Sequence, residues 1–596
     1  MRSAETILGI IRERGKQGLP LERVYRHLFN RDLYLMAYGK IYRNAGAMTQ
    51  GSTPETVDEM SLAKIDTIIG AVRFERYHWT PTRRISIEKK RSTKKRPLSM
   101  PTWSDKLLQE VIRLILGAYY EPQFSESSHG FRPGRGCHTA LRQIDQEWHG
   151  TVWFIEGDIK ACFDSLDHTL LVEMLAERIH DGRFLRLIRG LLKAGYLEEW
   201  EYRKTLSGVP QGGIVSPILA NISLTRLDKY VEKILIPAYT RGARRKKNLE
   251  YAALLGKVSQ LRRAGRTKEA MVFRRRAQRL PSVALADPHY RRLNYCRYAD
   301  DWLLGFAGPR EEAEQIKSRL KTFLQEELRL DLSEEKTLIT HARTQKARFL
   351  SYEITTEHED SAQTGRKRHI NGQIGLALPA DGLMGKCRPY LRNGKPIHRP
   401  ELINNTVYSI VAQYQAEYRG FAEYYQMADN IHRLNWLRWV MQQSLTKTLA
   451  AKLKITVKKV YERFHATWQV KGRPYKGLQV TVQREGKLPL IAKWGGIPLK
   501  RKPYAILNDQ PPQIWTSRSE LEQRLLADTC ELCESCDRVQ VHHIRALKDL
   551  HRRGRPEKPQ WVRVMAARKR KTLVVCWSCH RAIHAGEAVK QAKHTS

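Results

Sequence analysis

The sequence predicts a multidomain α+β protein, and three observations support this prediction. The chain has 596 residues, which exceeds what one hydrophobic core usually organises, so we expect three or more domains. Apolar residues recur at helical spacing in segments such as 104–120, whereas the apolar run of 151–158 is typical of a strand. A region rich in cysteine and histidine begins near residue 526, and it indicates a small unit stabilised by metal.

The charge balance points to a polyanionic partner. Lysine and arginine number 105 against 62 acidic residues, which gives a formal net charge of +43. Such an excess favours nucleic acid. Binding to a membrane surface is the alternative, but no apolar run approaches the length of a spanning helix, so we expect no membrane association.

The first residues and the cysteine distribution both predict a cytoplasmic protein. Glu5 interrupts the short apolar run near the start of the chain, which makes this run a poor signal peptide. The cysteines are not spaced like a disulfide framework, because most of them lie between Cys530 and Cys579. This clustering favours a reducing compartment and a local metal site.

The first third of the chain reads as helices around a basic hairpin. Residues 1–80 are predicted to form a helical extension with a polar interruption at 44–61. Residues 80–102 predict a basic β-hairpin, with a charged turn and a proline exit. A periodic apolar helix follows at 104–120. The strand of 151–158 should then lead into a helix capped by Asp167.

The middle and later segments change character twice. Residues of about 235–290 form a predicted basic insertion, partly helical and on the surface, whose role is either phosphate contact or that of a solvated linker. Residues 400–460 are helical and rich in aromatic side chains. Residues 461–525 are again basic, and they predict a small mixed domain or an extended linker.

Two adjacent aspartates, Asp300 and Asp301, lie in an otherwise apolar run. Burying two like charges side by side is costly, so they indicate either a solvated turn or a metal. Phosphoryl transfer by two metal ions needs several carboxylates gathered from strand ends. Asp158, at the end of its strand, is the natural third ligand, and the backbone carbonyl of Ile159 could complete the shell of two Mg²⁺ ions.

Six sequence blocks carry a resemblance to reverse transcriptases, especially those of group II introns. The YADD tetrapeptide ending at Asp301 resembles the YxDD box, and DIKACFDSLDH from Asp158 resembles the first aspartate motif. The other blocks follow the family's order: HGFRPGRGCHTAL (129–141), SGVPQGGIVSPILANISL (207–224), LDLSEEKT (330–337) and FLSYEI (349–354). The resemblance covers roughly residues 80–355, and it implies a right-hand polymerase with fingers and palm at 81–360.

The resemblance also implies roles for side chains around the aspartates. Asp158, Asp300 and Asp301 would hold the two metals. The residues expected to bind the nucleotide are Lys95 and Arg96 for the triphosphate, Phe163 to exclude a ribose 2′-hydroxyl and select dNTPs, Gln211 under the nascent base pair, and Lys336 near the leaving pyrophosphate. Phe163 could instead be an ordinary core residue. For Asp164 and Asp167 we favour hydrogen-bonding or capping roles.

The helical segment that follows resembles the thumb, or maturase (X) domain, of group II intron-encoded proteins, expected at 361–460. Its helices should pack through Leu434, Leu437, Val440 and Leu445, and its aromatic stripe should be mostly core. The basic region 461–525 would then bind DNA.

The cysteine and histidine pattern after residue 526 predicts a metal-stapled module. Two CxxC pairs, Cys530 with Cys533 and Cys576 with Cys579, fit a tetrahedral structural zinc. Cys536 is expected to be a spare thiol, although it could compete with Cys533.

This module resembles the HNH (ββα-metal) endonuclease at 526–596. His543 would be the general base, and His542, His580 and His584 would surround one divalent metal. The middle Asn of the pattern is not evident, because Lys571 and Thr572 stand before Cys576. The alternative is a zinc-stapled DNA-binding domain with inert histidines.

The resemblance as a whole is to a group II intron-encoded protein, which implies an RNA-directed DNA polymerase and HNH DNA endonuclease. Such a protein binds its intron RNA as a monomer or dimer, promotes splicing, nicks target duplex DNA and copies the intron by target-primed reverse transcription. It would be a bacterial protein associated with the nucleoid as a ribonucleoprotein. The alternative is an RNA-binding splicing maturase with inactive enzymatic sites; a retron-type enzyme would lack the two C-terminal regions.

Overall fold

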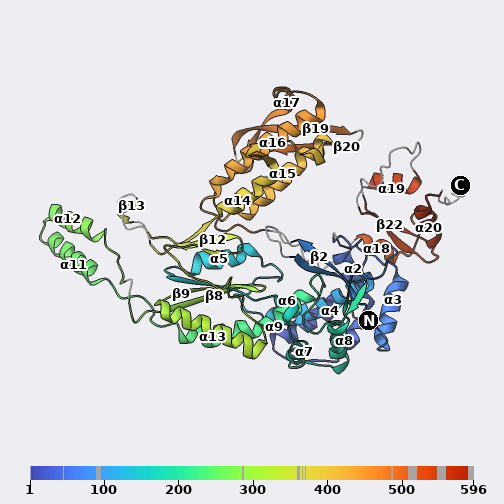
Figure 1. Ribbon diagram of the computed structural model, residues 1–596, viewed down its shortest axis with the longest axis horizontal. Helices are drawn as coiled ribbons and strands as arrows, with labels where there is room; N and C mark the ends of the chain where they lie inside the picture. Colours follow the sequence, from blue (N-terminus) through green and yellow to red (C-terminus); the bar gives the residue numbers. More distant parts are fainter. Residues whose placement is uncertain are drawn as a thin grey trace.

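The computed structural model describes most of the chain, with short gaps. The described residues are 2–44, 46–88, 95–284, 287–358, 363–364, 367–368, 371–470, 472–484, 487–507, 520–545, 559–568 and 570–587. Figure 1 shows an elongated molecule with a thumb above a central sheet, a helical arm at one end and the C-terminal module at the other. Among the described residues, no helix is both long enough and apolar enough to cross a membrane.

The N-terminal helices share one core with a long central helix. These elements are α1 (Ala4–Lys16), η1 (Val24–Phe29), α2 (Arg31–Ile41), α3 (Leu62–Arg73) and α4 (Trp103–Tyr120). The apolar side predicted for 104–120 is completely buried: Leu107, Leu108, Val111, Ile112 and Ile115 each have 0% exposure. The periodic pattern therefore placed α4 correctly, and this helix anchors the helices before it.

The predicted basic hairpin is present and forms the fingers sheet. Strands β2 (Thr82–Glu88) and β3 (Lys95–Met100) pair antiparallel, while the turn at 89–94 lies outside the described residues. The sheet order is β3-β2-β6-β7, with β6 (Tyr196–Glu198) and β7 (Glu201–Arg203).

The palm is a four-stranded antiparallel sheet of order β10-β4-β9-β8. Its strands are β4 (Trp153–Asp158), β8 (Arg292–Tyr298), β9 (Asp301–Ala307) and β10 (Ile339–His341). The helices of this region are α5 (Cys137–Glu147), α6 (Cys162–Ser165), α7 (His168–Ala176), α8 (Gly182–Lys193), α9 (Ser216–Tyr230) and α13 (Arg310–Leu328). As predicted, Asp167 caps α7, because its carboxylate accepts a hydrogen bond from the Leu170 N–H. A small sheet of β11 (Ala347–Phe349), β12 (Tyr352–Thr356) and β15 (Ile374–Ala377) lies between palm and thumb.

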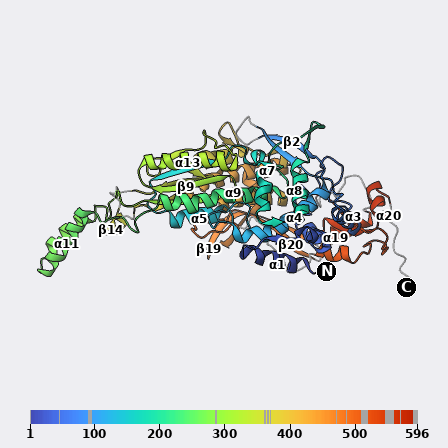
Figure 2. The ribbon, with the colours of Figure 1, turned by 90° about the horizontal axis from the view of Figure 1, so that it is seen from below.

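The basic insertion forms a helical hairpin that projects from the body. Helices α11 (Leu249–Arg263) and α12 (Thr267–Ala277) lie side by side, and both Figure 1 and Figure 2 show them away from the rest of the molecule. At the base of this arm, Lys247 pairs with Val283 and Arg241 pairs with Arg291. The arm is therefore a separate helical hairpin whose two connecting segments pair with each other at its base.

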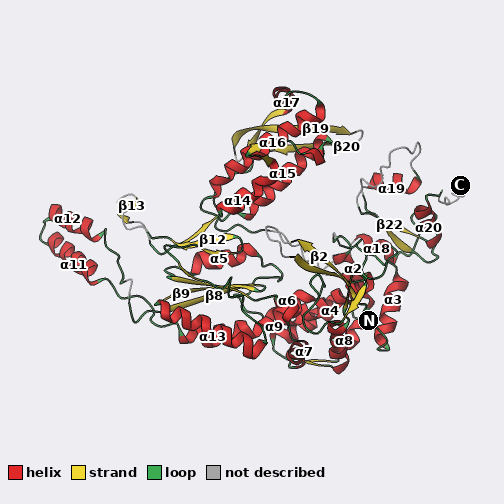
Figure 3. Ribbon diagram, viewed as in Figure 1, coloured by secondary structure: helices red, strands yellow, loops and turns green. Residues whose placement is uncertain are grey.

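The thumb combines helices with a sheet, as the colouring of Figure 3 makes plain. Its main elements are α14 (Ala380–Cys387), α15 (Val407–Tyr424), α16 (Leu434–Leu453), α17 (Val457–Phe464), β18 (His465–Val470), β19 (Arg473–Arg484) and β20 (Lys487–Trp494). The four residues expected to pack the helices all have 0% exposure. The Gln415 amide of α15 exchanges two hydrogen bonds with the backbone of Gly495, which ties the sheet to the helices. Within the predicted region 461–525, strands β18–β20 form a small sheet that packs on the thumb. Residues 508–519 lie outside the described residues, and residues 520–525 belong to a helix of the C-terminal module.

The C-terminal module is a β-hairpin with helices. It contains α18 (Glu520–Leu526), β21 (Gln540–His543), α19 (Gln560–Arg568), β22 (Thr572–Val575) and α20 (Trp577–Ala585). Leu532, Met565 and Ile583 belong to a small core of its own around the cysteines. Residues 546–558 and 588–596 of the predicted 526–596 domain lie outside the described residues.

Candidate active sites

The palm brings the three predicted aspartates to the end of two neighbouring strands. Asp158, the last residue of β4, is directly opposite Asp301, the first residue of β9. Asp300 lies in the tight turn before β9, where Ala299 has a φ of 56°. Adjacent aspartates are tolerated here because they occupy a turn and a strand end rather than a strand interior.

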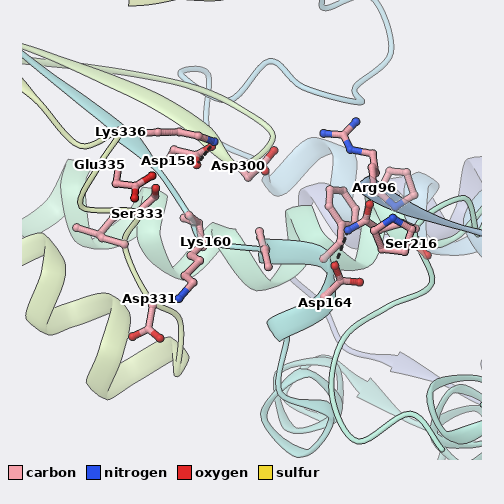
Figure 4. Close-up of a pocket in the computed structure, with 18 of the residues that line it drawn as sticks. Arg96, Asp158, Lys160, Asp164, Ser216, Asp300, Asp331, Ser333, Glu335 and Lys336 are labelled. Atoms are coloured by element: carbon pink, nitrogen blue, oxygen red, sulfur yellow. Dashed lines mark hydrogen bonds and ion pairs between the residues drawn. The ribbon is translucent and has the colours of Figure 1, made fainter. Parts of the chain in front are cut away.

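The predicted nucleotide-binding residues face one cavity beside this turn. The cavity has a volume of about 1250 Å³, and its lining includes Lys95, Arg96, Phe163, Gln211, Lys336, Asp158, Ile159 and Asp300. Figure 4 shows Lys336 beside Asp158, with Arg96 across the cavity. Asp301 is not part of the lining. The fold thus gathers residues from the fingers hairpin, the palm strands and the segment after α13.

The carboxylates repel one another, and a lysine partly neutralises them. Burial and the charges of Asp300 and Asp158 raise the pKa of Asp301 to about 7. Lys336 Nζ lies 2.6 Å from Asp158 Oδ2. The carboxylate oxygens of the three aspartates do not all lie within 4.8 Å of one another. Among the described residues, that spacing is reached by four cysteines and by a cluster of three histidines with one aspartate, both in the C-terminal module or at its edge. A cluster of hard oxygen donors with a raised pKa fits divalent cations, which would relieve this repulsion.

The segment that contains Gln211 lies close to the palm at one glycine and close to strand β3 of the fingers at another. Gly208 has a φ of 86°, and a Cβ there would lie 2.6 Å from backbone atoms of Asp164. Gly212 has a φ of 108°, and its Cβ would lie 2.4 Å from the Ser99 carbonyl oxygen. The Gln211 amide donates a 2.7 Å hydrogen bond to Asp164, which therefore has the hydrogen-bonding role favoured from the sequence.

A buried ion pair beneath the YADD turn was not predicted. Arg297 and Asp228 have side chains with 0% and 1% exposure, and their nearest atoms are 2.7 Å apart. Arg297 also donates to the Ala299 carbonyl oxygen at 2.8 Å, so it holds the turn directly. The sequence did contain an indication of this pair, because an arginine within the apolar strand LNYCRY requires a buried partner of opposite charge.

Replacing Asp228 with alanine should destabilise the palm by about 3–5 kcal/mol, because it leaves the Arg297 charge buried and unpaired. Since a multidomain chain has no single unfolding transition, the measurement is hydrogen exchange of β8 and β9 amides. Alanine at the exposed Asp331 is the control and should leave these rates unchanged. Equal exchange in both variants would contradict a stabilising role for the pair.

The four predicted zinc ligands converge in the C-terminal module. The sulfur atoms of Cys530, Cys533, Cys576 and Cys579 all lie within 4.8 Å of one another. The Cys533 and Cys576 sulfurs are 3.6 Å apart, close to the edge of about 3.8 Å that a tetrahedron with 2.3 Å zinc–sulfur bonds requires. The residues therefore fit a structural zinc. Cys536 is exposed and stands outside this cluster.

The three predicted histidine ligands also converge, and a fourth residue joins them. His580 Nε2 lies 3.0 Å from His542 Nδ1 and 3.1 Å from His584 Nε2. Metal–nitrogen bonds of about 2.0–2.1 Å would give tetrahedral edges of about 3.3 Å, so the donor set fits a divalent cation. Asp58, from the N-terminal region, completes the cluster. No pattern in the polar segment 44–61 indicated this.

His543 lies in the same hairpin but faces away from solvent. It is 5% exposed, and its Nε2 shares a 2.8 Å hydrogen bond with the Tyr38 hydroxyl. Burial lowers the pKa of His543 to about 3. Thr572, which precedes Cys576 where the Asn of the pattern is not evident, is directly opposite His543 on β22, and its hydroxyl accepts a hydrogen bond from Arg524. Arg524 was not singled out from the sequence.

Comparison with known proteins identifies three families along the chain. Residues 87–252 match reverse transcriptase (RNA-dependent DNA polymerase), residues 374–484 match type II intron maturase, and residues 530–580 match the AI2M/AI1M-like HNH endonuclease. The maturase match includes β18 and most of β19.

Three curated proteins are similar along almost the whole chain. The group II intron-encoded protein LtrA of Lactococcus lactis subsp. cremoris is 38% identical over 585 residues, covering 94% of this chain and 95% of that protein. An uncharacterized 91 kDa protein in the cob intron of Schizosaccharomyces pombe is 35% identical, covering 94% of this chain and 69% of that one. The putative COX1/OXI3 intron 1 protein of Saccharomyces cerevisiae is 30% identical, covering 93% and 68%.

Proposed function

The chain belongs to the group II intron-encoded proteins, as a reverse transcriptase and maturase with an HNH endonuclease domain, and from this premise we propose how its two active sites work. The chain is an RNA-directed DNA polymerase and an endonuclease, it binds intron RNA, and both activities use divalent metal. The proposals below concern the residues, the ions and the order of events.

In the polymerase, Asp158, Asp300, Asp301 and the Ile159 carbonyl hold two Mg²⁺ ions. When bound, these ions activate the primer hydroxyl and neutralise the triphosphate. Lys95 and Arg96 bind the phosphates of the incoming dNTP, and Phe163 excludes a ribose 2′-hydroxyl. Lys336 exchanges its contact with Asp158 for one with the leaving pyrophosphate. The observation that carries this proposal is the single cavity lined by residues from separate elements.

In the endonuclease, His543 takes a proton from the attacking water, and His542, His580 and His584 hold one divalent ion that stabilises the leaving 3′-oxygen. The cut in duplex target DNA leaves a 3′-hydroxyl. The polymerase then extends this end with dNTPs, using the intron RNA as template. One protein thus supplies both the primer end and the enzyme that extends it, working on the RNA as a monomer or dimer.

The test is target-primed cDNA synthesis by the purified intron ribonucleoprotein on labelled duplex DNA. Nicked strand and extended product are measured together. A protein that splices its intron but neither nicks nor polymerises would overturn the proposal in favour of a maturase with inactive sites.

The projecting arm of α11 and α12 binds RNA phosphates. Its last helical turns carry adjacent arginines, Arg274 to Arg276 among them, and one face of each helix is exposed. A shape-directed RNA contact needs charge rather than base recognition. The same basic surface could otherwise serve only as a solvated linker, and this alternative is testable.

Replacing 248–282 with a two-residue turn should weaken intron RNA binding and reduce its dependence on salt. Lys247 and Val283 already pair, so the turn can close without disturbing the palm. Each lost phosphate contact should lower the slope of log K against log salt by roughly 0.7–0.9. Filter binding at several salt concentrations measures both quantities. A variant with Arg274, Arg275 and Arg276 changed to glutamine is the matched control for charge, and an unchanged slope in both would support the linker alternative.

A further inference from the structure

The endonuclease hairpin is joined to the N-terminal region through its main chain. Val541 of β21 pairs antiparallel with Met60: the Val541 N–H donates to the Met60 carbonyl at 2.8 Å, and the Glu59 N–H donates to the Val541 carbonyl at 3.1 Å. Both Met60 and Val541 have 0% exposure. Figure 1 shows the module with α18, β22 and α20 beside α2 and α3. Met60 therefore forms an isolated antiparallel β-bridge with the nuclease hairpin, directly after the turn that contains Asp58.

Apolar packing reinforces this contact. Leu521, Leu525, Val539, Val541 and Val574 belong to the same core as the N-terminal helices and α4, whereas the zinc side of the module has a separate core. One side of the module thus packs around the cysteines, and the other side is buried against α2 and the segment after it.

Asp58 occupies a ligand position at the histidine cluster. Its carboxylate lies 3.0 Å from His584 Nε2, 3.3 Å from His580 Nε2 and 3.6 Å from His542 Nδ1. Three imidazoles and one carboxylate make four donors. Catalytic zinc sites usually have three protein ligands and keep one position for water or substrate, whereas zinc sites with four protein ligands are structural. With Asp58 in place, the cluster has four protein ligands and no position left for water or substrate.

The proposed general base is covered by the same region. The Tyr38 hydroxyl of α2 shares a hydrogen bond with His543 Nε2, and the Tyr42 ring lies 6.1 Å from the His543 ring. The backbone N–H of His543 donates a 2.7 Å hydrogen bond to the Asp58 carboxylate. A base that must reach a water at a scissile phosphate cannot do so while buried in this way.

We infer that the N-terminal region holds the endonuclease in a closed state, with Asp58 as a fourth metal ligand in the place that the scissile phosphate must take. This inference rests on the proposed roles of His543 and the three histidines. Nicking then requires Asp58 to leave the metal and the hairpin to leave Met60. Target DNA favours the open state because only that state offers it the metal and the base. The closed state would protect other DNA from being nicked.

The first experiment compares Asp58→Asn with Glu59→Gln in the full-length ribonucleoprotein. Each removes one acidic charge from adjacent positions, but Glu59 is exposed and outside the cluster. Asp58→Asn should lose hydrogen-exchange protection at the Val541 and Glu59 amides, bind Mn²⁺ more weakly by calorimetry, and nick non-target duplex DNA faster by about tenfold, an ordinary size for coupling between two states. Glu59→Gln should match the unaltered protein in all three measurements. Slower nicking by Asp58→Asn would overturn the inference, because Asp58 would then belong to the working site.

The second experiment locks the closed state with Met60→Cys and Val541→Cys. Paired residues in antiparallel strands have Cα atoms about 4.5–5.5 Å apart, which suits a disulfide. The oxidised variant should not nick target DNA, and reduction should restore nicking. Undiminished nicking by the oxidised variant would overturn the inference. His543→Ala distinguishes failure of the proposed active site from failure of the inferred closed state. If His543→Ala nicks normally, the proposed site itself is wrong. If His543→Ala is inactive while Asp58→Asn shows no change, the site stands and only the inferred closed state is wrong.

Discussion

Alanine at both Asp300 and Asp301 is expected to abolish cDNA synthesis while splicing and DNA nicking continue. Asp301 is the first residue of β9 and lies opposite Asp158, and Asp300 precedes it in the turn. The double variant would therefore lose two of the three proposed carboxylate ligands. Losing one preorganised electrostatic contact already costs about 10²–10³-fold in rate, so the double variant should lose more than about 10³-fold. The measurement is extension of an annealed DNA primer on RNA, with splicing and nicking assayed on the same preparation.

The matched control replaces two other carboxylates of the same cavity, Asp331 and Glu335, with alanine. Both are exposed residues that line the cavity, and neither has a proposed metal role. This control should retain most of the polymerase activity. Comparable loss in the two double variants would mean that the negative charge of the cavity, rather than specific ligation, supports synthesis.

Alanine at His543 is expected to abolish nicking and to leave extension of a supplied primer unaffected. A general base contributes about 10²–10⁴-fold to a rate. Loss of this imidazole should therefore prevent cDNA synthesis on intact duplex DNA but not on DNA that already carries a nick. Both substrates are tested with the same ribonucleoprotein preparation.

Alanine at the exposed His149 is the control for removing a histidine, and it should behave like the unaltered protein. The zinc content should also remain unchanged in the His543 variant, since the four cysteines hold a separate core. Undiminished nicking with normal zinc would favour a zinc-stapled DNA-binding domain with inert histidines.

Much of the chemistry could be predicted because it depends on local patterns. The 3.6-residue spacing of apolar side chains located α4, and the β-branched run with a proline exit located the hairpin of β2 and β3. Asp167 was recognisable as a helix cap, and the two CxxC pairs as a zinc site. These features require only neighbours within a few residues, so a single sequence displays them.

The gathering of the palm residues was predictable only through resemblance. No local sequence pattern predicts that Asp158 lies opposite Asp301 in the sheet or that Lys336 forms an ion pair with Asp158. These contacts depend on sheet register across more than a hundred residues. The fold brings the predicted nucleotide-binding residues to one cavity.

The sequence by itself determined the protein's family, particular elements such as α4, the hairpin of β2 and β3 and the helix capped by Asp167, and the residue types that bear its chemistry, because motif spacing and hydrophobic periodicity are local. The tertiary structure alone decided that Arg297 meets Asp228 beneath the YADD turn, that β18–β20 pack on α15, and that Asp58 joins the histidines of a domain hundreds of residues away. Such contacts follow from complementary packing and from the need of each buried charge for a partner. No periodic pattern encodes which partner that will be.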